Sequence, residues 1–161
     1  MYFYKAKKER TKFNMEEENT TKDVDTEEDE GFNERKEKYM IEDAEENCNN
    51  KEFMIKALDD GVTWVVAYAN DTLHADKELM LKGVQVDGQL LYYASKELRN
   101  DKAVVLSAVK NKWRILKYAS KELRGDIDIA IEALKQNKEA LMYIEDNIKD
   151  REEIKKILNQ Q

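Results

Sequence analysis

Few side chains in this sequence have the types and spacing that catalysis requires. The 161 residues contain one histidine, His74, and one cysteine, Cys48. His74 falls in a predicted turn, where we expect an exposed side chain rather than a general base. The sequence has no glycine-rich phosphate loop, nucleophile elbow or zinc-ligand spacing, and its paired carboxylates lie at predicted helix starts, where capping explains them. We therefore expect no enzymatic activity, no bound metal and no cofactor.

A cluster of cations around one tryptophan is the first candidate for binding chemistry. Between residues 101 and 125 the chain carries seven Lys or Arg residues and only two acids. A tryptophan ringed by cations is typical of an interaction hot spot or of a phosphate-contacting patch. The alternative is a solvated basic face with the indole folded over its neighbours. The candidate partner-binding residues of this cluster are Lys110, Lys112, Trp113, Arg114 and Lys117.

The second candidate is an acidic run near the N-terminus. Residues 15–30 hold nine acids against one lysine, whereas residues 51–161 hold 19 acids and 19 bases. Three interpretations stay open: a charge mimic that occupies a basic groove on a partner, a segment that folds back on residues 101–125, or a solubilising tail. The low hydrophobicity predicts that the arm, residues 1–31, is disordered when free. Its candidate partner-binding residues are Glu16, Glu17, Glu18, Asp25, Glu27, Glu28, Asp29 and Glu30.

Four tyrosines recur at a 25-residue interval, namely Tyr68, Tyr93, Tyr118 and Tyr143. A ladder of aromatic rings can stack nucleobases. A column at one constant phase of a repeat is, however, typical of a core whose hydroxyl groups reach its wet edge. We favour the core interpretation.

The elements that must position these residues are set by an internal repeat. Seven consecutive residues, 93–99, recur letter for letter as residues 118–124. Such a repeat predicts an all-α solenoid of about four short helical hairpins of 25 residues each. The predicted order is a charged arm (1–31), a half-repeat cap (32–49), four units (50–75, 76–100, 101–125, 126–150) and a C-terminal capping helix (151–161). At least about three stacked units are needed to bury a continuous core.

Each predicted unit begins with a helix cap and continues as two helices and a short turn. The caps are Asn50, Asp76, Asp101 and Asp126. The first helix carries apolar columns and one column of small residues that permits close helix approach: Ala57, Gly83, Ala108 and Ala133. A polar turn leads to a second helix that carries the tyrosines. The basic unit 101–125 precedes an acidic one, and this alternation favours ion pairs between neighbours over a continuous nucleic-acid stripe.

Residues 93–109 and their continuation to Tyr143 resemble a family of short helical repeats described as domain of unknown function 4116. The resemblance extends over residues 76–150 and, loosely, over residues 50–75. It implies the helical-repeat fold and a bacterial or phage origin, and the family has no agreed activity. One departure concerns the polar turn, which in the family commonly ends in glycine. Gly88 keeps this residue, whereas Trp113 and Lys138 take its place in the next two units.

The composition favours a binding protein over an enzyme or a membrane protein. With one cysteine the chain cannot form an internal disulfide, and the sequence has no apolar run of membrane-spanning length. We therefore expect a cytoplasmic protein, of a bacterium or an infected host cell, that makes no contact with a membrane. We expect a non-catalytic protein-interaction module; the alternative is a small acidic inhibitor, encoded by a phage or mobile element, that blocks a nucleic-acid-binding enzyme such as a defence nuclease. The expected partner is a protein with a basic surface, and direct nucleic-acid binding is less favoured.

Overall fold

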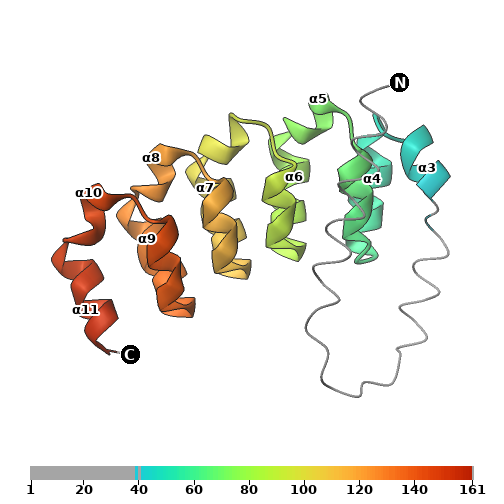
Figure 1. Ribbon diagram of the computed structural model, residues 1–161. Helices are drawn as coiled ribbons and strands as arrows, with labels where there is room; N and C mark the ends of the chain where they lie inside the picture. Colours follow the sequence, from blue (N-terminus) through green and yellow to red (C-terminus); the bar gives the residue numbers. More distant parts are fainter. Residues whose placement is uncertain (1–38, 40, 161) are drawn as a thin grey trace, which may run out of the picture.

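The computed structural model describes residue 39 and residues 41–160, and in these residues every regular element is a helix (Figure 1). The predicted all-helical class is confirmed. The arm and most of the predicted cap before residue 41 lie outside the described residues. With η marking a 3₁₀-helix, the elements are α3 (Ile41–Glu46), α4 (Lys51–Asp59), η2 (Thr63–Tyr68), α5 (Asp71–His74), α6 (Lys77–Val86), η3 (Gly88–Tyr92), η4 (Leu98–Asn100), α7 (Lys102–Asn111), η5 (Trp113–Tyr118), α8 (Lys121–Arg124), α9 (Ile127–Gln136), η6 (Lys138–Tyr143), α10 (Asp146–Lys149) and α11 (Glu152–Gln160).

The predicted helix caps are confirmed. In each case a side-chain oxygen accepts a backbone N–H of the first helical turn, which satisfies a donor that the helix itself leaves free. The Asn50 side chain accepts from Phe53 at 3.0 Å, and the Asp76 side chain accepts from Leu79 at 2.9 Å. Asp101 and Asp126 each accept two such N–H groups. These four residues therefore fix where α4, α6, α7 and α9 begin.

The second helix of each predicted unit is a 3₁₀-helix of five or six residues, not an α-helix. Helix α7 has ten residues and is about 15 Å long. Six residues span about 12 Å as a 3₁₀-helix, against about 9 Å as an α-helix. The tighter coil therefore lets a short segment run back along most of the α-helix beside it. Hydrophobic periodicity alone does not separate the two helix types.

The helices form two layers that follow the order of the sequence. Each long α-helix packs against the next, from α4 through α6, α7 and α9 to α11, and these helices form a curved row (Figure 1). The elements η2, η3, η5 and η6 pack against one another in the same order and form the second layer. The short helices α5, α8 and α10 lie along the upper edge of the row in Figure 1.

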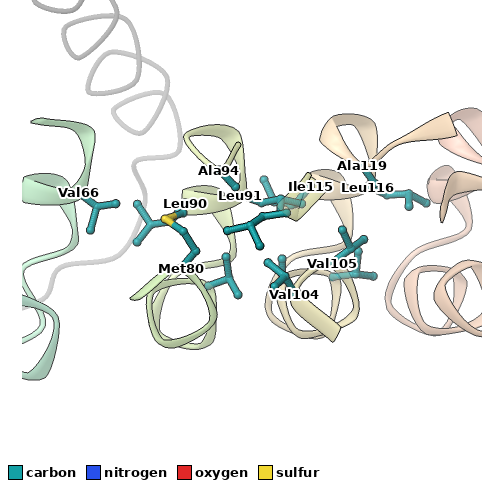
Figure 2. Packing of buried hydrophobic residues seen from close by; sticks show 14 of the residues in the cluster. Val66, Met80, Leu90, Leu91, Ala94, Val104, Val105, Ile115, Leu116 and Ala119 are labelled. Atoms are coloured by element: carbon teal, nitrogen blue, oxygen red, sulfur yellow. The ribbon is translucent and has the colours of Figure 1, made fainter. Parts of the chain in front are cut away.

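The core lies between the two layers, where Leu91 and Leu116 of the η elements meet Met80, Val104 and Val105 of the α-helices (Figure 2). The small-residue column is buried at all four positions, as the pattern predicts. One apolar column, Met54, Met80, Val105 and Ala130, is inaccessible to solvent at all four positions. The neighbouring apolar column is only partly buried, and it comprises Ile55, Leu81, Leu106 and Ile131.

A backbone ladder joins the short edge helices at a constant interval. In each rung an N–H donates to a carbonyl of the preceding turn. The rungs are Asn70 to Cys48 at 2.7 Å, Ser95 to His74 at 2.8 Å, Ser120 to Arg99 at 2.9 Å and Glu145 to Arg124 at 3.2 Å. The donors are 25 residues apart, so the same connection recurs four times along the row.

Candidate binding surface

The second layer, made of η2, η3, η5 and η6, carries most of the aromatic side chains of the described residues. Apart from Tyr39 and Phe53, every Phe, Tyr and Trp there lies in an η element or, for Tyr93, at the end of η3. We call the half-exposed side of these elements the η face: Trp64, Tyr68, Gln89, Tyr92, Tyr93, Trp113, Arg114, Lys117, Tyr118, Glu139, Met142 and Tyr143.

The rings of the η face contact one another between successive η elements. Tyr92 lies 5.1 Å from Tyr118, and Trp113 lies 6.1 Å from Tyr143, measured between ring centroids. All four residues of the tyrosine column are partly buried and pack against the core. The core interpretation of that column is therefore confirmed.

The predicted basic cluster divides between two surfaces. Lys110 is exposed in the last turn of α7, and the Lys112 ammonium lies 3.2 Å from Asp87. Arg114 and Lys117 lie on η5, in the η face. The Arg114 guanidinium is 4.6 Å from the centre of the Trp113 ring, and the Lys117 ammonium is 4.9 Å from the centre of the Tyr118 ring.

Trp113 is folded over its neighbours. Its ring packs against the core and is covered on one side by Arg114, and its backbone N–H donates to Gln136 Oε1 at 3.1 Å. The indole is thus held in place before any partner arrives. A ring that is already ordered loses little conformational entropy on binding, which favours a role as an interface anchor.

Side-chain amides at the ends of α7 and α9 explain the departure from glycine in the turn. Asn111 accepts the Gly88 N–H at 3.0 Å and donates to the Gln85 carbonyl at 3.3 Å. Gln136 makes the equivalent bonds to the Trp113 N–H and the Lys110 carbonyl, and it also donates to the Val109 carbonyl. A Cβ on Gly88 would lie 2.6 Å from the Ala108 carbonyl oxygen. The glutamine is one methylene longer than the asparagine, so its amide can bond a turn that stands farther from the helix, where a tryptophan can be accommodated.

Ion pairs join the first turns of neighbouring α-helices, and the charge alternation predicts such pairs between residues 101–125 and residues 126–150. Each pair joins the first residue of one helix to the cap of the next: Lys51–Asp76 at 2.8 Å, Lys77–Asp101 at 2.6 Å and Lys102–Asp126 at 2.8 Å. The hydrogen bond from Lys77 holds the pKa of Asp101 below its ordinary value, although burial opposes this shift. The cations on this side of the row are therefore largely neutralised within the chain.

Two of the hollows on the surface lie where successive 25-residue intervals meet. One, of about 310 Å³, is lined by Lys117, Arg124, Met142, Tyr143, Ile144, Glu145, Asp146 and Lys149. The other, of about 390 Å³, is lined by Lys96, Glu97, Asn100, Ser120, Lys121 and Glu122. The first adjoins the η face. The second is bordered entirely by polar side chains.

The predicted exposure of His74 is wrong. Its side chain is 8% exposed, Nε2 lies 2.8 Å from the Val66 carbonyl oxygen, and the ring stacks on Tyr93. His74 lies at the repeat position that Arg99 and Arg124 occupy 25 and 50 residues later. This shared position is the feature of the sequence that could have indicated a structural role for His74. Within residue 39 and residues 41–160, no three His, Cys, Asp or Glu side chains are grouped as metal ligands would be. The eight acidic candidates between residues 16 and 30 lie outside the described residues.

Two overlapping stretches, residues 76–124 and residues 104–149, match the family model described as domain of unknown function (DUF4116). The predicted resemblance is confirmed. Each DUF4116 match spans about two of the 25-residue intervals, and together they include α6 through α10. Comparisons with curated proteins and with solved structures gave no match. None of the described helices is both long enough and apolar enough to cross a bilayer.

Proposed function

We propose that this chain is a solenoid of four 25-residue units, with a charged N-terminal arm, that acts as a non-catalytic protein-interaction module. The recurrence of the backbone ladder at four successive boundaries, and of the Lys–Asp pairs at three of them, supports the solenoid. Stacked units of this kind present extended surfaces, and the connecting segments on them carry binding.

The composition of the η face carries the interaction proposal. Tyrosine, tryptophan, methionine and arginine are enriched at the centres of protein interfaces, and all four occur on this face. Its rings are fixed by mutual contacts, so little side-chain freedom is lost on binding. Met142 is 70% exposed and is the most exposed large apolar side chain among the described residues.

The layer of long α-helices differs from the η face in composition, and its composition is that of a solvent-facing surface. The long helices α6, α7, α9 and α11 contain no aromatic residue, and their exposed positions are mostly charged or polar. Exposed ion pairs add little stability, and they leave few cations available to a nucleic acid. The η face is therefore the surface on which this chain would recognise a protein.

A paired substitution tests the proposal. Gln89→Glu with Arg114→Glu changes two side chains of the η face, and Lys56→Glu with Gln85→Glu makes the same kinds of change on α4 and α6. We expect proteins captured from a lysate of the source organism by the wild-type chain to be lost with the first pair and retained with the second. Retention of the same proteins by both pairs would contradict the proposal. Circular dichroism establishes that both variants are folded.

The acidic run supports a second candidate function, an inhibitor that occupies a basic groove on a nucleic-acid-binding enzyme. Nine carboxylates in 16 residues resemble the charge density of a nucleic acid. Replacing Glu27, Glu28, Asp29 and Glu30 by their amides should abolish such inhibition and leave capture through the η face unchanged. Inhibition that survives this change would exclude the mimic.

A further inference from the structure

The hollow beside η6 is lined by Lys117 of η5 and Tyr143 of η6. Between η3 and η5, the preceding boundary of the second layer, the residue equivalent to Lys117 has an aromatic ring. At that previous boundary Tyr92 packs against Tyr118, with 5.1 Å between ring centroids. Twenty-five residues later the equivalent residues are Lys117 and Tyr143. The Lys117 ammonium lies over the ring of its own neighbour, Tyr118. The ring that η5 does place near Tyr143, that of Trp113 at 6.1 Å, is not among the residues that line the hollow.

We propose that this hollow receives a segment of a partner protein that carries an aromatic side chain next to a carboxylate. The inference rests on the proposed interaction function and assigns its anchor point. The hollow measures about 310 Å³, which is in the range of sites that hold small organic groups. Tyr143 and Met142 supply an aromatic ring and a thioether that an incoming ring would contact.

The charges around the hollow select a carboxylate. Arg124 pairs with Glu145 at 2.7 Å, and Lys149 pairs with Asp146 at 2.7 Å. Lys117 has no carboxylate within ion-pair distance among the described residues, and its contact is with the Tyr118 ring. A carboxylate beside the incoming ring would therefore pair with Lys117, whereas a cation there would be repelled. Charge and shape thus favour one class of segment.

The repeat itself supplies the decisive substitution. Lys117→Tyr places at this boundary the residue that Tyr92 provides at the previous one, and so fills the hollow while removing the cation. Because the same ring pairing is accommodated at the previous boundary, we expect the variant to fold with unchanged or higher stability. Lys110→Tyr is the matched control, since Lys110 is an exposed lysine of the same unit that does not line the hollow.

The probe is the peptide acetyl-Glu-Asp-Tyr-Asp-Glu-amide, titrated into the full chain labelled at its methionine methyl groups. We expect saturable binding that shifts the Met142 methyl resonance, at least tenfold weaker binding to Lys117→Tyr, and unchanged binding to Lys110→Tyr. The same peptide with alanine in place of tyrosine, or with lysine in place of the acids, should bind at least tenfold more weakly.

Several outcomes would overturn the inference. Equal binding of the tyrosine and alanine peptides would show charge attraction alone, and absence of a Met142 shift would place the peptide elsewhere. Self-association in sedimentation that Lys117→Tyr abolishes would assign the hollow to a second copy of the chain. If the peptide does not bind but protein capture still depends on Gln89 and Arg114, the anchor is wrong and the proposed function stands. If capture does not depend on these residues, the proposed function fails.

Discussion

Gly88→Ala tests how tightly neighbouring units pack. Gly88 has no left-handed backbone conformation, because only Gly61 among the described residues has a positive φ. Its requirement for glycine comes from close approach, since a Cβ would lie 2.6 Å from the Ala108 carbonyl oxygen and 3.2 Å from Asn111 Cβ. The first contact is with backbone at the end of α7, which cannot rotate away. The end of α7 must therefore separate from η3.

We expect Gly88→Ala to reduce the free energy of unfolding by about 2–3 kcal/mol. Overpacking of a close contact costs about 1–3 kcal/mol. Separation also weakens the Asn111 hydrogen bonds, each of which contributes about 1 kcal/mol. Urea unfolding followed by circular dichroism measures the change, and an unchanged dependence on urea concentration shows that the native fold is kept.

Gly125→Ala is the matched control. The nearest atom to its added Cβ is Asn147 Oδ1 at 3.3 Å, which belongs to an exposed side chain that can move. Its φ of -94° suits alanine, so we expect no loss of stability, or a gain of about 0.4–1 kcal/mol from reduced freedom of the unfolded chain. Asn111→Gln should lower the cost of Gly88→Ala by about 1 kcal/mol, because it reproduces the longer amide found opposite Trp113. Equal effects of the two alanine substitutions would refute this account of the turn.

Three further predictions concern the core and two ionisable groups. Leu116→Ala removes a fully buried side chain and should reduce the free energy of unfolding by about 2–5 kcal/mol, measured by urea unfolding. The pKa of Asp101 in the folded state lies below its ordinary value of 3.8. Its contribution to stability is therefore present above that pH and is lost as the pH falls through the folded pKa. Asp101→Asn keeps the cap, so the difference in stability between the wild type and this variant should shrink below about pH 4. Burial and the hydrogen bond to Asp60 raise the pKa of Tyr39 to about 12. The tyrosinate absorbance of Tyr39, measured as the difference between the wild type and Tyr39→Phe, should therefore appear well above pH 10. Asp60→Asn should lower the pH at which this absorbance appears.

Much of the fold could be predicted because the repeat allows each residue to be compared with the residues at the same position of the other intervals. Asp76, Asp101 and Asp126 stand at one phase and could be recognised as caps, and the small-residue column indicated close helix packing. The nature of the second helix could not be predicted. Five or six residues contain at most two turns of either helix type, and we attribute the 3₁₀ form to the length of the α-helix beside it.

The errors in the site have a common physical cause, which is that neighbouring units modify each other. His74 looks like a turn residue in its own unit, yet the Tyr93 ring of the next unit stacks on it. For Trp113 the sequence left open a binding hot spot and an indole folded over its neighbours, and the contacts with Gln136 and Arg114 show the folded position. The hollow beside Tyr143 depends on Lys117 occupying the position of Tyr92, a difference that is visible in the aligned units but acquires meaning only with the Tyr92–Tyr118 contact.

The most direct test of the account is the comparison of protein capture by two double variants. Gln89→Glu with Arg114→Glu alters the η face, and Lys56→Glu with Gln85→Glu alters the opposite layer by the same kinds of change. The account predicts that quantitative mass spectrometry finds the wild-type set of captured proteins with the second variant and finds it depleted at least tenfold with the first. Equal capture by both variants would contradict the claim that the η face is the binding surface.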